Sequence, residues 1–397
     1  MPESILILGG DGYIGWPAAM HFSNLGYDVT IVDNCFRRGL EENSDIGFLY
    51  KTPSLVERAI KWKEFTGKQI NVIIGDLRNA TLLRKILSNK KIFLDWPRMK
   101  VAIKKPKTII HYAEQPSATY SQLSSETSLF TLVNNLSVTN NLLFAVKDFC
   151  PETHIIKLGT MGEYGTPNID IEEGWLEISH KGRSDKFLFP RQAGSIYHTS
   201  KIMDTDLIWF AVRTWGLKVT DLMQGPVYGL ETKETKINEA FKTFFNYDEF
   251  FGTVINRFIV QTIIGHPMTI YGTGNQKRGY ISLQDSINCS EISLKNPPSS
   301  GELKIYNQIS ETFSVNDIAN LILDSALKKG YRASIKYMKN PRVEAENHYY
   351  NPHYSSLVDL GFQPQLLDQS VIQSMLDICE KYKKNIKKEV FFKGVKW

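Results

Sequence analysis

Residues 4–15 read Ser-Ile-Leu-Ile-Leu-Gly-Gly-Asp-Gly-Tyr-Ile-Gly. Residues 5–8 have the length and β-branching of a buried strand. Gly9, Gly12 and Gly15 follow at intervals of three, and a helix-compatible run begins there. In this context the glycines make the turn, let the backbone approach a pyrophosphate, and let the helix pack close to the strand. The helix N-terminus attracts phosphates. The stretch therefore predicts a dinucleotide site.

The second predicted strand, residues 27–32, ends in Asp33. A carboxylate about twenty residues past the glycines is typical of dinucleotide sites. It can bind both hydroxyls of an adenosine ribose, and it would repel a 2′-phosphate. The pattern thus favours NAD over NADP, with a solvated Asp at an ordinary turn as the alternative. We place the neighbouring Tyr13, Ile14 and Asn34 in the same cofactor site.

The composition is that of a soluble globular protein of one large domain or two, with 397 residues, 42% of them hydrophobic and 22% charged. The net charge of +5 suits an anionic substrate and demands neither a nucleic acid nor a membrane. The four cysteines stand far apart, which predicts neither a metal site nor disulfides. The chain starts almost directly on a core strand, and we expect a cytoplasmic protein.

A long connection, residues 34–68, separates the second strand from the third. Such connections are normally short. This one contains an amphipathic stretch at 54–65, and we expect it to form a helix and to fold over the cofactor. Arg37 and Arg38 lie at its start, where they could meet an adenosine phosphate or face water.

Further strands are expected at 71–74, 108–111, 154–158 and 217–222, with helices at 129–149 and 195–215. Strands that alternate with helices predict an α/β fold, a doubly wound parallel (Rossmann) sheet, which binds ligands at the carboxyl ends of its strands. Asp76 and Leu77 follow one strand end. Asp76 could accept a hydrogen bond from the adenine amino group, or simply cap a helix.

The regular alternation of strands and helices ends near residue 227. Turns, short strands and helices at 315–329 and 369–383 follow. We therefore predict two domains. Residues 1–226 form the NAD-binding domain, with insertions at 34–68 and 166–194. Residues 227–397 form a smaller, partly interleaved α/β substrate domain, some segments of which return to the first.

Tyr197 and Lys201 stand four residues apart, on one face of a helix. A phenol is a poor base at its usual pKa of about 10, and a nearby ammonium lowers that value. Such a pair can remove a proton from a substrate hydroxyl while a hydride passes to a nicotinamide. Lys201 can also hold the nicotinamide ribose.

Together the glycines, Asp33, Asp76 and the Tyr197/Lys201 pair resemble the extended short-chain dehydrogenase/reductase family that acts on nucleotide sugars. Residues 157–174 and 340–350 resemble the branch of that family that joins sulfite to UDP-glucose. The resemblance implies oxidation at sugar C4, loss of water across C5 and C6, sulfite addition at C6 and return of the hydride from a recycled, tightly bound NAD. It also implies that Thr160 aligns O4, and a homodimer built through the helices at 129–149 and 195–215.

The sequence departs from related sugar 4,6-dehydratases, which have Asp and Glu where this chain has Met161 and Gly162. A carboxylate beside C6 would repel sulfite, so an apolar Met161 and a small Gly162 make room for an anion. The proton transfers must then move to other residues. Glu163 and His198 are the nearest candidates, and for each a purely structural role is the alternative.

Residues 271–280 resemble the family's strand and loop whose Arg contacts the nucleotide diphosphate, which suggests Arg278 with Tyr280. Arg342 is the second candidate, and for either Arg a surface charge is the alternative. Pro116 stands where close relatives have an Arg, so another cation must replace that contact. The remaining candidates for substrate binding are Gln115, Gln224, Asn256 and Arg257.

Other functions remain open at this point. A UDP-sugar 4-epimerase or a 4,6-dehydratase would share the fold and the Thr160, Tyr197 and Lys201 set. A non-catalytic regulator that binds NAD or a nucleotide sugar would have no need of the Tyr/Lys pair.

Overall fold

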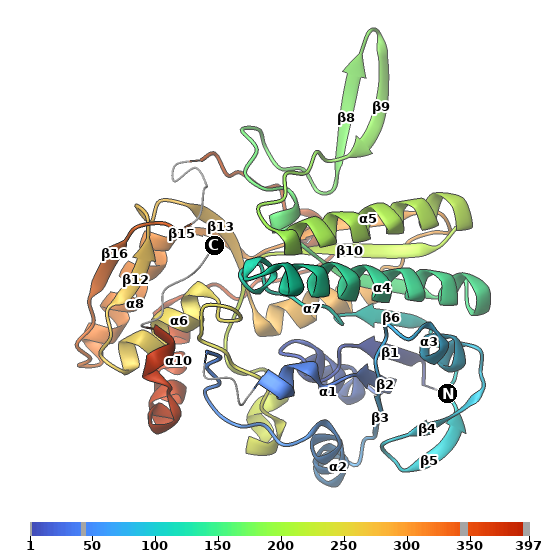
Figure 1. Ribbon diagram of the computed structural model, residues 1–397, viewed down its shortest axis with the longest axis horizontal. Helices are drawn as coiled ribbons and strands as arrows, with labels where there is room; N and C mark the ends of the chain where they lie inside the picture. Colours follow the sequence, from blue (N-terminus) through green and yellow to red (C-terminus); the bar gives the residue numbers. More distant parts are fainter. Residues whose placement is uncertain (1, 41–44, 342–347, 392–397) are drawn as a thin grey trace.

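The computed structural model describes residues 2–40, 45–341 and 348–391. Its centre is a seven-stranded sheet in which every paired neighbour runs parallel (Figure 1). The strand order is β14-β10-β7-β6-β1-β2-β3. The strands are β1 (Ser4–Leu8), β2 (Asp28–Asp33), β3 (Ile70–Ile74), β6 (Thr108–His111), β7 (His154–Thr160), β10 (Lys218–Gln224) and β14 (Leu303–Gln308). The predicted doubly wound α/β fold is confirmed.

Helices cover both faces of this sheet and create two separate apolar cores. One core includes residues of α1 (Gly15–Asn24), α2 (Leu55–Thr66) and α7 (Leu283–Lys295). The other includes residues of α3 (Ala80–Leu87), α4 (Ser125–Phe149) and α5 (Ile196–Trp215). The strands are apolar on both sides because both sides are covered. The ends of the strands are thereby left as the place for a ligand.

Helix α4 is long and apolar enough, by length and composition, to cross a membrane, and 44% of its most apolar window is buried in the protein. It packs against α3 and α5. Its apolar character is therefore accounted for on one side by the core, as in many soluble proteins.

The second half of the chain contributes its own core. It is built from α6 (Val254–Ile263), α8 (Val315–Lys328), α10 (Gln369–Lys381) and the parallel pair β12 (Met268–Tyr271) and β16 (Ile335–Met338). A small sheet of β11 (Val227–Tyr228), β13 (Lys277–Ser282) and β15 (Glu311–Ser314) joins it to the rest. Strand β14 lies beyond the predicted boundary at 226 but pairs with β10 in the central sheet. The exact division into domains stays a prediction.

Two hairpins were not predicted. The insertion at 166–194 contains β8 (Trp175–His180) and β9 (Arg183–Leu188), an antiparallel pair that projects from the body of the molecule in Figure 1. The other is β4 (Lys91–Leu94) with β5 (Met99–Ala102), and a short helix α9 (Ser356–Asp359) also went unforeseen. The four cysteines form no disulfide, as predicted.

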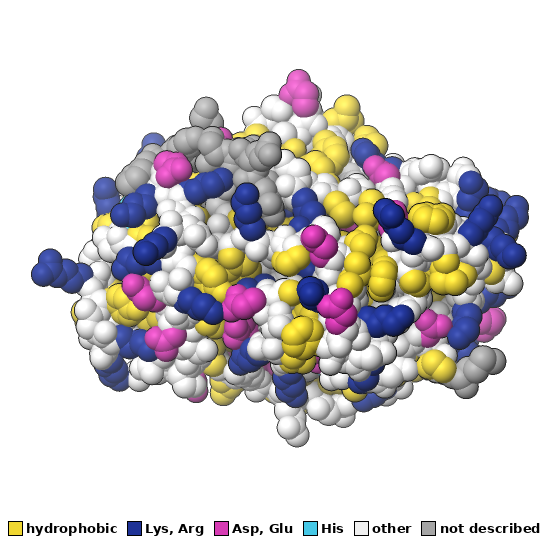
Figure 2. Space-filling model, turned by 90° about the horizontal axis from the view of Figure 1, so that it is seen from below, with side chains coloured by type: hydrophobic (Ala, Val, Ile, Leu, Met, Phe, Trp, Pro, Cys, Tyr) yellow, Lys and Arg dark blue, Asp and Glu magenta, His cyan; other side chains and the backbone are white. Residues whose placement is uncertain are grey.

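The face seen in Figure 2 carries Lys and Arg side chains spread among Asp and Glu side chains. Charges of both signs alternate there, and no broad field of one sign covers it. This pattern agrees with the mild net charge of +5. A polyanion would need a concentrated basic surface, which this face does not offer.

Candidate active site

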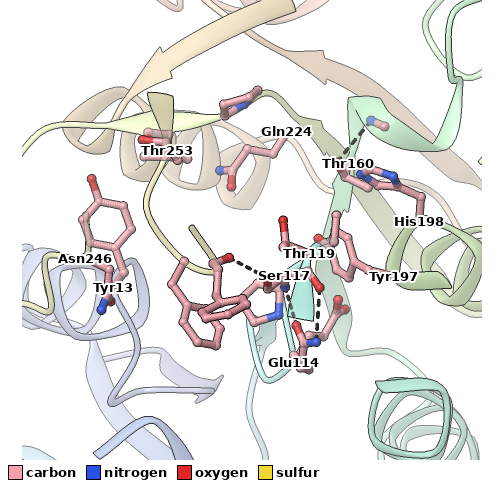
Figure 3. A pocket seen from close by; sticks show the side chains of 18 of the residues that line it. Tyr13, Glu114, Ser117, Thr119, Thr160, Tyr197, His198, Gln224, Asn246 and Thr253 are labelled. Carbon is pink, nitrogen blue, oxygen red and sulfur yellow. Dashed lines mark hydrogen bonds between the residues drawn. The ribbon is translucent and has the colours of Figure 1, made fainter. Parts of the chain in front are cut away.

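One large cavity, about 860 Å³ in volume, lies at the carboxyl ends of the parallel strands. Its floor includes residues at the ends of β1, β2, β6, β7 and β10. Residues 246, 249–254 and 256–258, from the second half of the chain, form the opposite wall. In Figure 3, Thr160, Tyr197 and His198 lie together on one side, and Tyr13 and Asn246 lie on the other. The cavity therefore has room for two ligands placed end to end.

The glycine turn has the geometry that a dinucleotide needs. Gly9 has a φ of +86°, a conformation that residues with side chains rarely adopt. A Cβ on Gly15 would stand 2.0 Å from the carbonyl oxygen of Gly9, so only glycine lets α1 start this close to β1. Gly9, Gly12, Tyr13, Ile14 and Gly15 all line the cavity. These residues fit the pyrophosphate of a dinucleotide.

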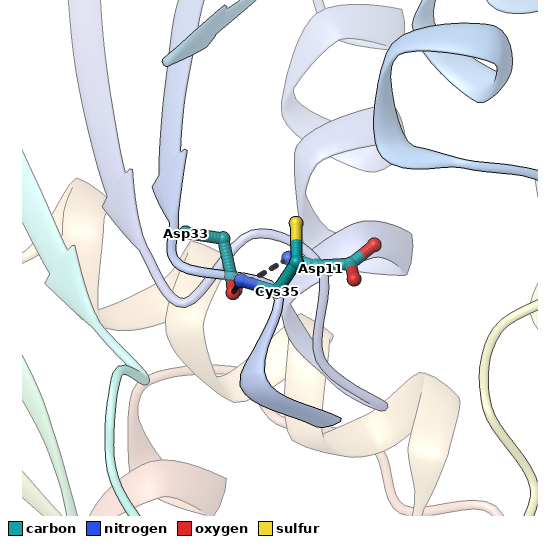
Figure 4. Close-up of side chains that lie close together, drawn as sticks. All are labelled: Asp11, Asp33 and Cys35. Carbon is teal, nitrogen blue, oxygen red and sulfur yellow. Dashed lines mark hydrogen bonds between the residues drawn. The ribbon is translucent and has the colours of Figure 1, made fainter. Parts of the chain in front are cut away.

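Asp33 lines the cavity at the end of β2 and is held by the backbone. One of its oxygens accepts a hydrogen bond from the amide of Asp11 (2.9 Å) and the other from the amide of Cys35 (2.7 Å) (Figure 4). Burial raises the pKa of Asp33 to about 6, and the nearby Asp11 adds to the rise. The fixed carboxylate is placed to accept hydroxyls of a ribose.

Asp11, Asp33 and Cys35 approach one another closely enough to suggest a metal site, with ligand atoms within 4.8 Å. Arginines already satisfy the Asp11 carboxylate. Arg38 donates to both of its oxygens, from Nε and Nη2, at 2.7 Å each, and the fully buried Arg58 of α2 also pairs with it. This arrangement ties the insertion to the glycine turn and leaves no reason to place a cation there.

Arg37 and Arg38, which the sequence places near the cofactor, have different surroundings. Arg38 is tied to Asp11 and to Thr52 and does not line the cavity, so the structure places it neither on a phosphate nor in open water. Arg37 does line the cavity, where it donates to Asn246 Oδ1 (2.6 Å) and lies over the ring of Phe251. Burial lowers the pKa of Arg37 to about 10, which still leaves it a cation.

Asn34, Asp76 and Leu77 also line the cavity. Asp76 has a partner of its own, because Arg78 donates to both carboxylate oxygens. This pairing lowers the pKa of Asp76. A contact from Asp76 to adenine would thus be made by a carboxylate that Arg78 already neutralises.

Thr160, Met161, Tyr197 and His198 form one wall of the cavity. Thr160 ends β7, and its hydroxyl oxygen accepts the amide of Gly162 at 3.2 Å. Ser195 caps α5 by accepting the amide of His198 (3.1 Å) and also lies 3.0 Å from His198 Nδ1. These bonds fix the imidazole beside the turn at Met161–Glu163, which is the 3₁₀ helix η3.

Gly162 explains why that imidazole fits. A Cβ built on Gly162 would stand 2.2 Å from His198 Nε2 and 2.4 Å from Cδ2. Any side chain at position 162 would therefore collide with the ring. In this chain the imidazole of His198 occupies the space beside position 162.

Lys201 has contacts that the sequence did not predict. Its ammonium is fully buried, pairs with Glu114 and donates to the carbonyl of Leu158, and Lys201 does not line the cavity. Burial lowers the pKa of Lys201, but the charge of Glu114 outweighs it and the net pKa is raised. The pKa of Tyr197 is also raised, first by burial and then by Glu114. The expected lowering of the Tyr197 pKa is not found in the chain without cofactor.

Glu163 lies beneath the wall and not on it. Its side chain is fully buried, accepts the amide of Thr160 at 3.3 Å and the hydroxyl of Thr205 at 3.2 Å, and lies 3.9 Å from Lys157. Burial raises its pKa. Glu163 does not line the cavity, so its contacts fit the structural alternative.

The predicted substrate residues all line the cavity except Arg342, which lies outside the described residues. Arg257 pairs with Glu249, whose other oxygen is buried without a hydrogen-bond partner. Arg278 donates to the carbonyl of Lys277 (2.7 Å) and lies 2.9 Å from His348 Nε2. The others on this wall are Gln115, Gln224, Asn256 and Tyr280.

Sequence reasoning missed the segment at 241–252, which crosses the glycine turn. The hydroxyl of Thr243 donates to the carbonyl of Tyr13 (2.8 Å), and the indole of Trp16 donates to the carbonyl of Phe241 (3.0 Å). Asn246, Glu249 and Phe251 enter the cavity from it. The segment is rich in Phe and Tyr but has no motif, so only its aromatic content could have marked it.

Comparison with known proteins agrees with this geometry. A model of the NAD dependent epimerase/dehydratase family matches residues 5–307. The chain is 41% identical over 395 residues to the chloroplastic UDP-sulfoquinovose synthase of Spinacia oleracea, covering 100% of this chain and 79% of that protein. It is 39% identical over 396 residues to the UDP-sulfoquinovose synthase of Sulfolobus acidocaldarius, covering 99% and 97%. The chain belongs to the NAD dependent epimerase/dehydratase family, among its UDP-sulfoquinovose synthases.

Solved structures share the fold. UDP-glucose 4-epimerase of Thermotoga maritima, solved with UDP-glucose, matches with a TM-score of 0.67 at 18% identity, covering 95% of this chain and 99% of that one. UDP-glucuronic acid 4-epimerase of Bacillus cereus, in complex with UDP-glucuronic acid and NAD, matches with a TM-score of 0.65 at 19% identity, with the same coverage. The prediction of NAD as cofactor is confirmed by the family.

Proposed function

We propose that this chain makes UDP-sulfoquinovose from UDP-glucose and sulfite, with NAD held throughout. The observation that carries the proposal is the wall formed by Met161, Gly162 and His198, where the His198 ring fills the space that a side chain at position 162 would need and an apolar Met stands at position 161. The cofactor NAD would supply the acceptor and donor of the C4 hydride, and the glycine turn with Asp33 would hold it. The other steps belong to side chains of this chain.

Tyr197 and Thr160 act at the C4 hydroxyl. Tyr197 takes the hydroxyl proton as the hydride leaves, and it gives that proton back when C4 is reduced. The oxygen of Thr160 accepts the amide of Gly162, so its own proton is available to hold O4. A 4-ketone then acidifies the proton on C5.

His198 is the side chain that we assign to the elimination of water. An imidazole can both accept and donate a proton, so His198 can take the C5 proton and pass it to the departing C6 hydroxyl, which leaves as water. Its contacts with Ser195 and Gly162 fix the ring on the cavity wall. Sulfite, arriving as bisulfite, then gives its proton to His198 and adds to C6 as the dianion, and His198 delivers that proton to C5. Met161, which is apolar and 4% exposed, keeps a repelling carboxylate away from the anion.

Cations for the anionic groups of the substrates stand on the cavity wall. Arg278 and Arg257 are the candidates for the UDP diphosphate, since a planar guanidinium suits phosphate. Arg257 also pairs with Glu249. Arg342 remains a candidate from the resemblance alone. We further propose that Arg37 meets a phosphate of NAD, because it is a partly buried cation on the cavity wall with no carboxylate within ion-pair distance among the described residues.

The test is to incubate the NAD-loaded protein with UDP-glucose and sulfite and to look for a sulfonated UDP-sugar by mass spectrometry. We expect a product that depends on sulfite and is absent with the Tyr197→Phe variant. UDP-galactose formed without sulfite, and no sulfonate with it, would overturn the proposal in favour of a 4-epimerase.

We also propose that the chain is a homodimer through α4 and α5. Large apolar side chains stand exposed on these helices, among them Leu129 (61%), Val133 (46%) and Phe210 (46%). A shallow hollow between the two helices is lined by Leu136, Met203 and Leu207. Light scattering should give twice the 45.4 kDa chain mass, and Phe210→Asp should give the single mass. A single mass for the unmodified protein would contradict the dimer.

We propose a cytoplasmic location, supported by four cysteines that form no disulfide. Fractionation of cells that produce the protein would test it, and recovery with an organelle, as the name of the spinach relative indicates for that protein, would contradict it.

A further inference from the structure

Glu114 lies just after β6, and neither the sequence motifs nor the proposed reaction gives it a role. The residue lines the cavity, and only 6% of its side chain is exposed. One oxygen, Oε2, accepts a hydrogen bond from the Lys201 ammonium. The other, Oε1, is buried and has no hydrogen-bond partner. A buried carboxylate oxygen without a donor is costly, which points to a partner that arrives with a ligand.

Lys201 stands behind Glu114. Its side chain is 1% exposed, and it contacts Glu114 and the carbonyl of Leu158 but does not line the cavity. The phosphates of a nucleotide would be repelled by this carboxylate, whereas a ribose hydroxyl is a donor of the right chemistry.

We propose that Glu114 is a cofactor-binding and positioning residue: one oxygen holds Lys201 in place, and the other accepts a hydroxyl of the nicotinamide ribose. This inference rests on the proposed function only through NAD and the role of Tyr197. It does not depend on the identity of the sugar or on sulfite.

The same carboxylate acts on Tyr197. The charged or titratable groups around that phenol are Glu114 after β6, Lys157 on β7, Glu163 in η3, and His198, Lys201 and Asp204 on α5. Burial and then Glu114 raise the pKa of Tyr197. Removal of the negative charge frees the Lys201 ammonium to favour the phenolate. The pKa of Tyr197 should therefore fall.

The test compares Glu114→Gln, which keeps the shape and loses the charge, with Glu173→Gln as a matched control. Glu173 is a carboxylate away from the cavity that accepts the amides of Asn307 and Ser356. NAD binding is measured by calorimetry on stripped protein with no sugar or sulfite present. We expect the Glu114→Gln variant to bind NAD about tenfold more weakly, since a charged acceptor bonds roughly twice as strongly as a neutral one.

The pH profile of kcat/KM gives a second measurement. The acid limb of this profile reports the ionisation of Tyr197. Its midpoint should move down by about one pH unit in Glu114→Gln and stay in place in Glu173→Gln. Unchanged NAD affinity and an unchanged acid limb in a folded Glu114→Gln variant would overturn the inference. Loss of sulfosugar synthesis by the parent protein, with normal NAD binding, would count against the proposed function and not against Glu114.

Thermal melting keeps the test decisive if Glu114→Gln folds poorly. Lys201→Met leaves a buried carboxylate without its cation, so it should melt below the double variant Glu114→Gln/Lys201→Met. Strictly additive effects of the two changes would show that the pair is not coupled, and would overturn the positioning role.

Discussion

Gly162→Ala tests the placement of His198 most directly. An added Cβ would stand 2.2 Å from Nε2, whereas ordinary contact begins at 3.4 Å. The ring must therefore move by the shortfall, about 1.2 Å, or break its contact with Ser195. A displacement of about 1 Å costs an enzyme about a hundredfold in rate, and loss of general acid–base catalysis costs about 10²- to 10⁴-fold. We expect kcat for the sulfonated product to fall at least about a hundredfold.

The partial reactions separate this effect from general damage. Oxidation at C4 uses Tyr197 and Thr160 and not His198, so NADH absorbance on addition of UDP-glucose alone should persist in the Gly162→Ala variant. Gly39→Ala is the control, because a Cβ there meets nothing within 4 Å. A Gly162→Ala variant that makes product at the parent rate would refute the assignment of His198. Equal loss of C4 oxidation and product would place the defect elsewhere on the wall.

Other perturbations test the rest of the site. Tyr197→Phe should lower kcat about 10²- to 10⁴-fold while NAD affinity, measured by calorimetry, stays within about twofold, and a fully active variant would contradict its role as base. Arg58→Met removes a fully buried cation from Asp11 and should cost about 3 kcal/mol of unfolding free energy in urea, whereas a change near zero would show that Arg38 alone suffices. Burial lowers the pKa of His111 to about 4 and that of His154 to about 3, so the unfolded chain binds more protons below about pH 6.5. Stability should then fall from pH 7 to pH 5 by about 2 kcal/mol for each histidine, and His154→Gln should show a smaller fall; equal falls would contradict this.

The parts of the fold that the sequence predicts are those set by local pattern. The run before Gly9 is apolar because β1 is covered on both sides, and the central strands were placed within about two residues for the same physical reason. Strand β14 was missed because nothing in its own residues marks its partner. It pairs with β10, some eighty residues earlier, and only the folded chain brings the two together.

In the site, too, local sequence predicts some features and only the folded chain determines the others. Residues that belong to motifs, such as Gly15 and Tyr197, are found on the cavity wall. The environment of a residue was not predictable, because it depends on contacts distant in sequence. Lys201 was expected to face the ribose and is instead tied to Glu114, which lies 87 residues earlier. Arg38 was expected near a phosphate or in water and is instead bound to Asp11, a residue inside the glycine motif.

Two segments of the chain are tied to the glycine turn. The first follows β2, and its Arg38 and Arg58 pair with Asp11, while the second is the segment at 241–252. Arg58 links them, because it pairs with Asp11 and donates to the carbonyl of Lys242 (3.3 Å). Thr243 also donates to the carbonyl of Tyr13 (2.8 Å).

We predict that NAD bound in the cavity leaves only when the bonds that join these segments to the glycine turn are broken. A reaction that stores a hydride across two further bond changes at C5 and C6 needs such retention, since escape of the reduced cofactor would strand the sugar as a ketone. An epimerase needs it only briefly. We therefore predict that Arg58→Met, which breaks the link between the two segments, releases NAD during gel filtration, whereas the parent protein retains it.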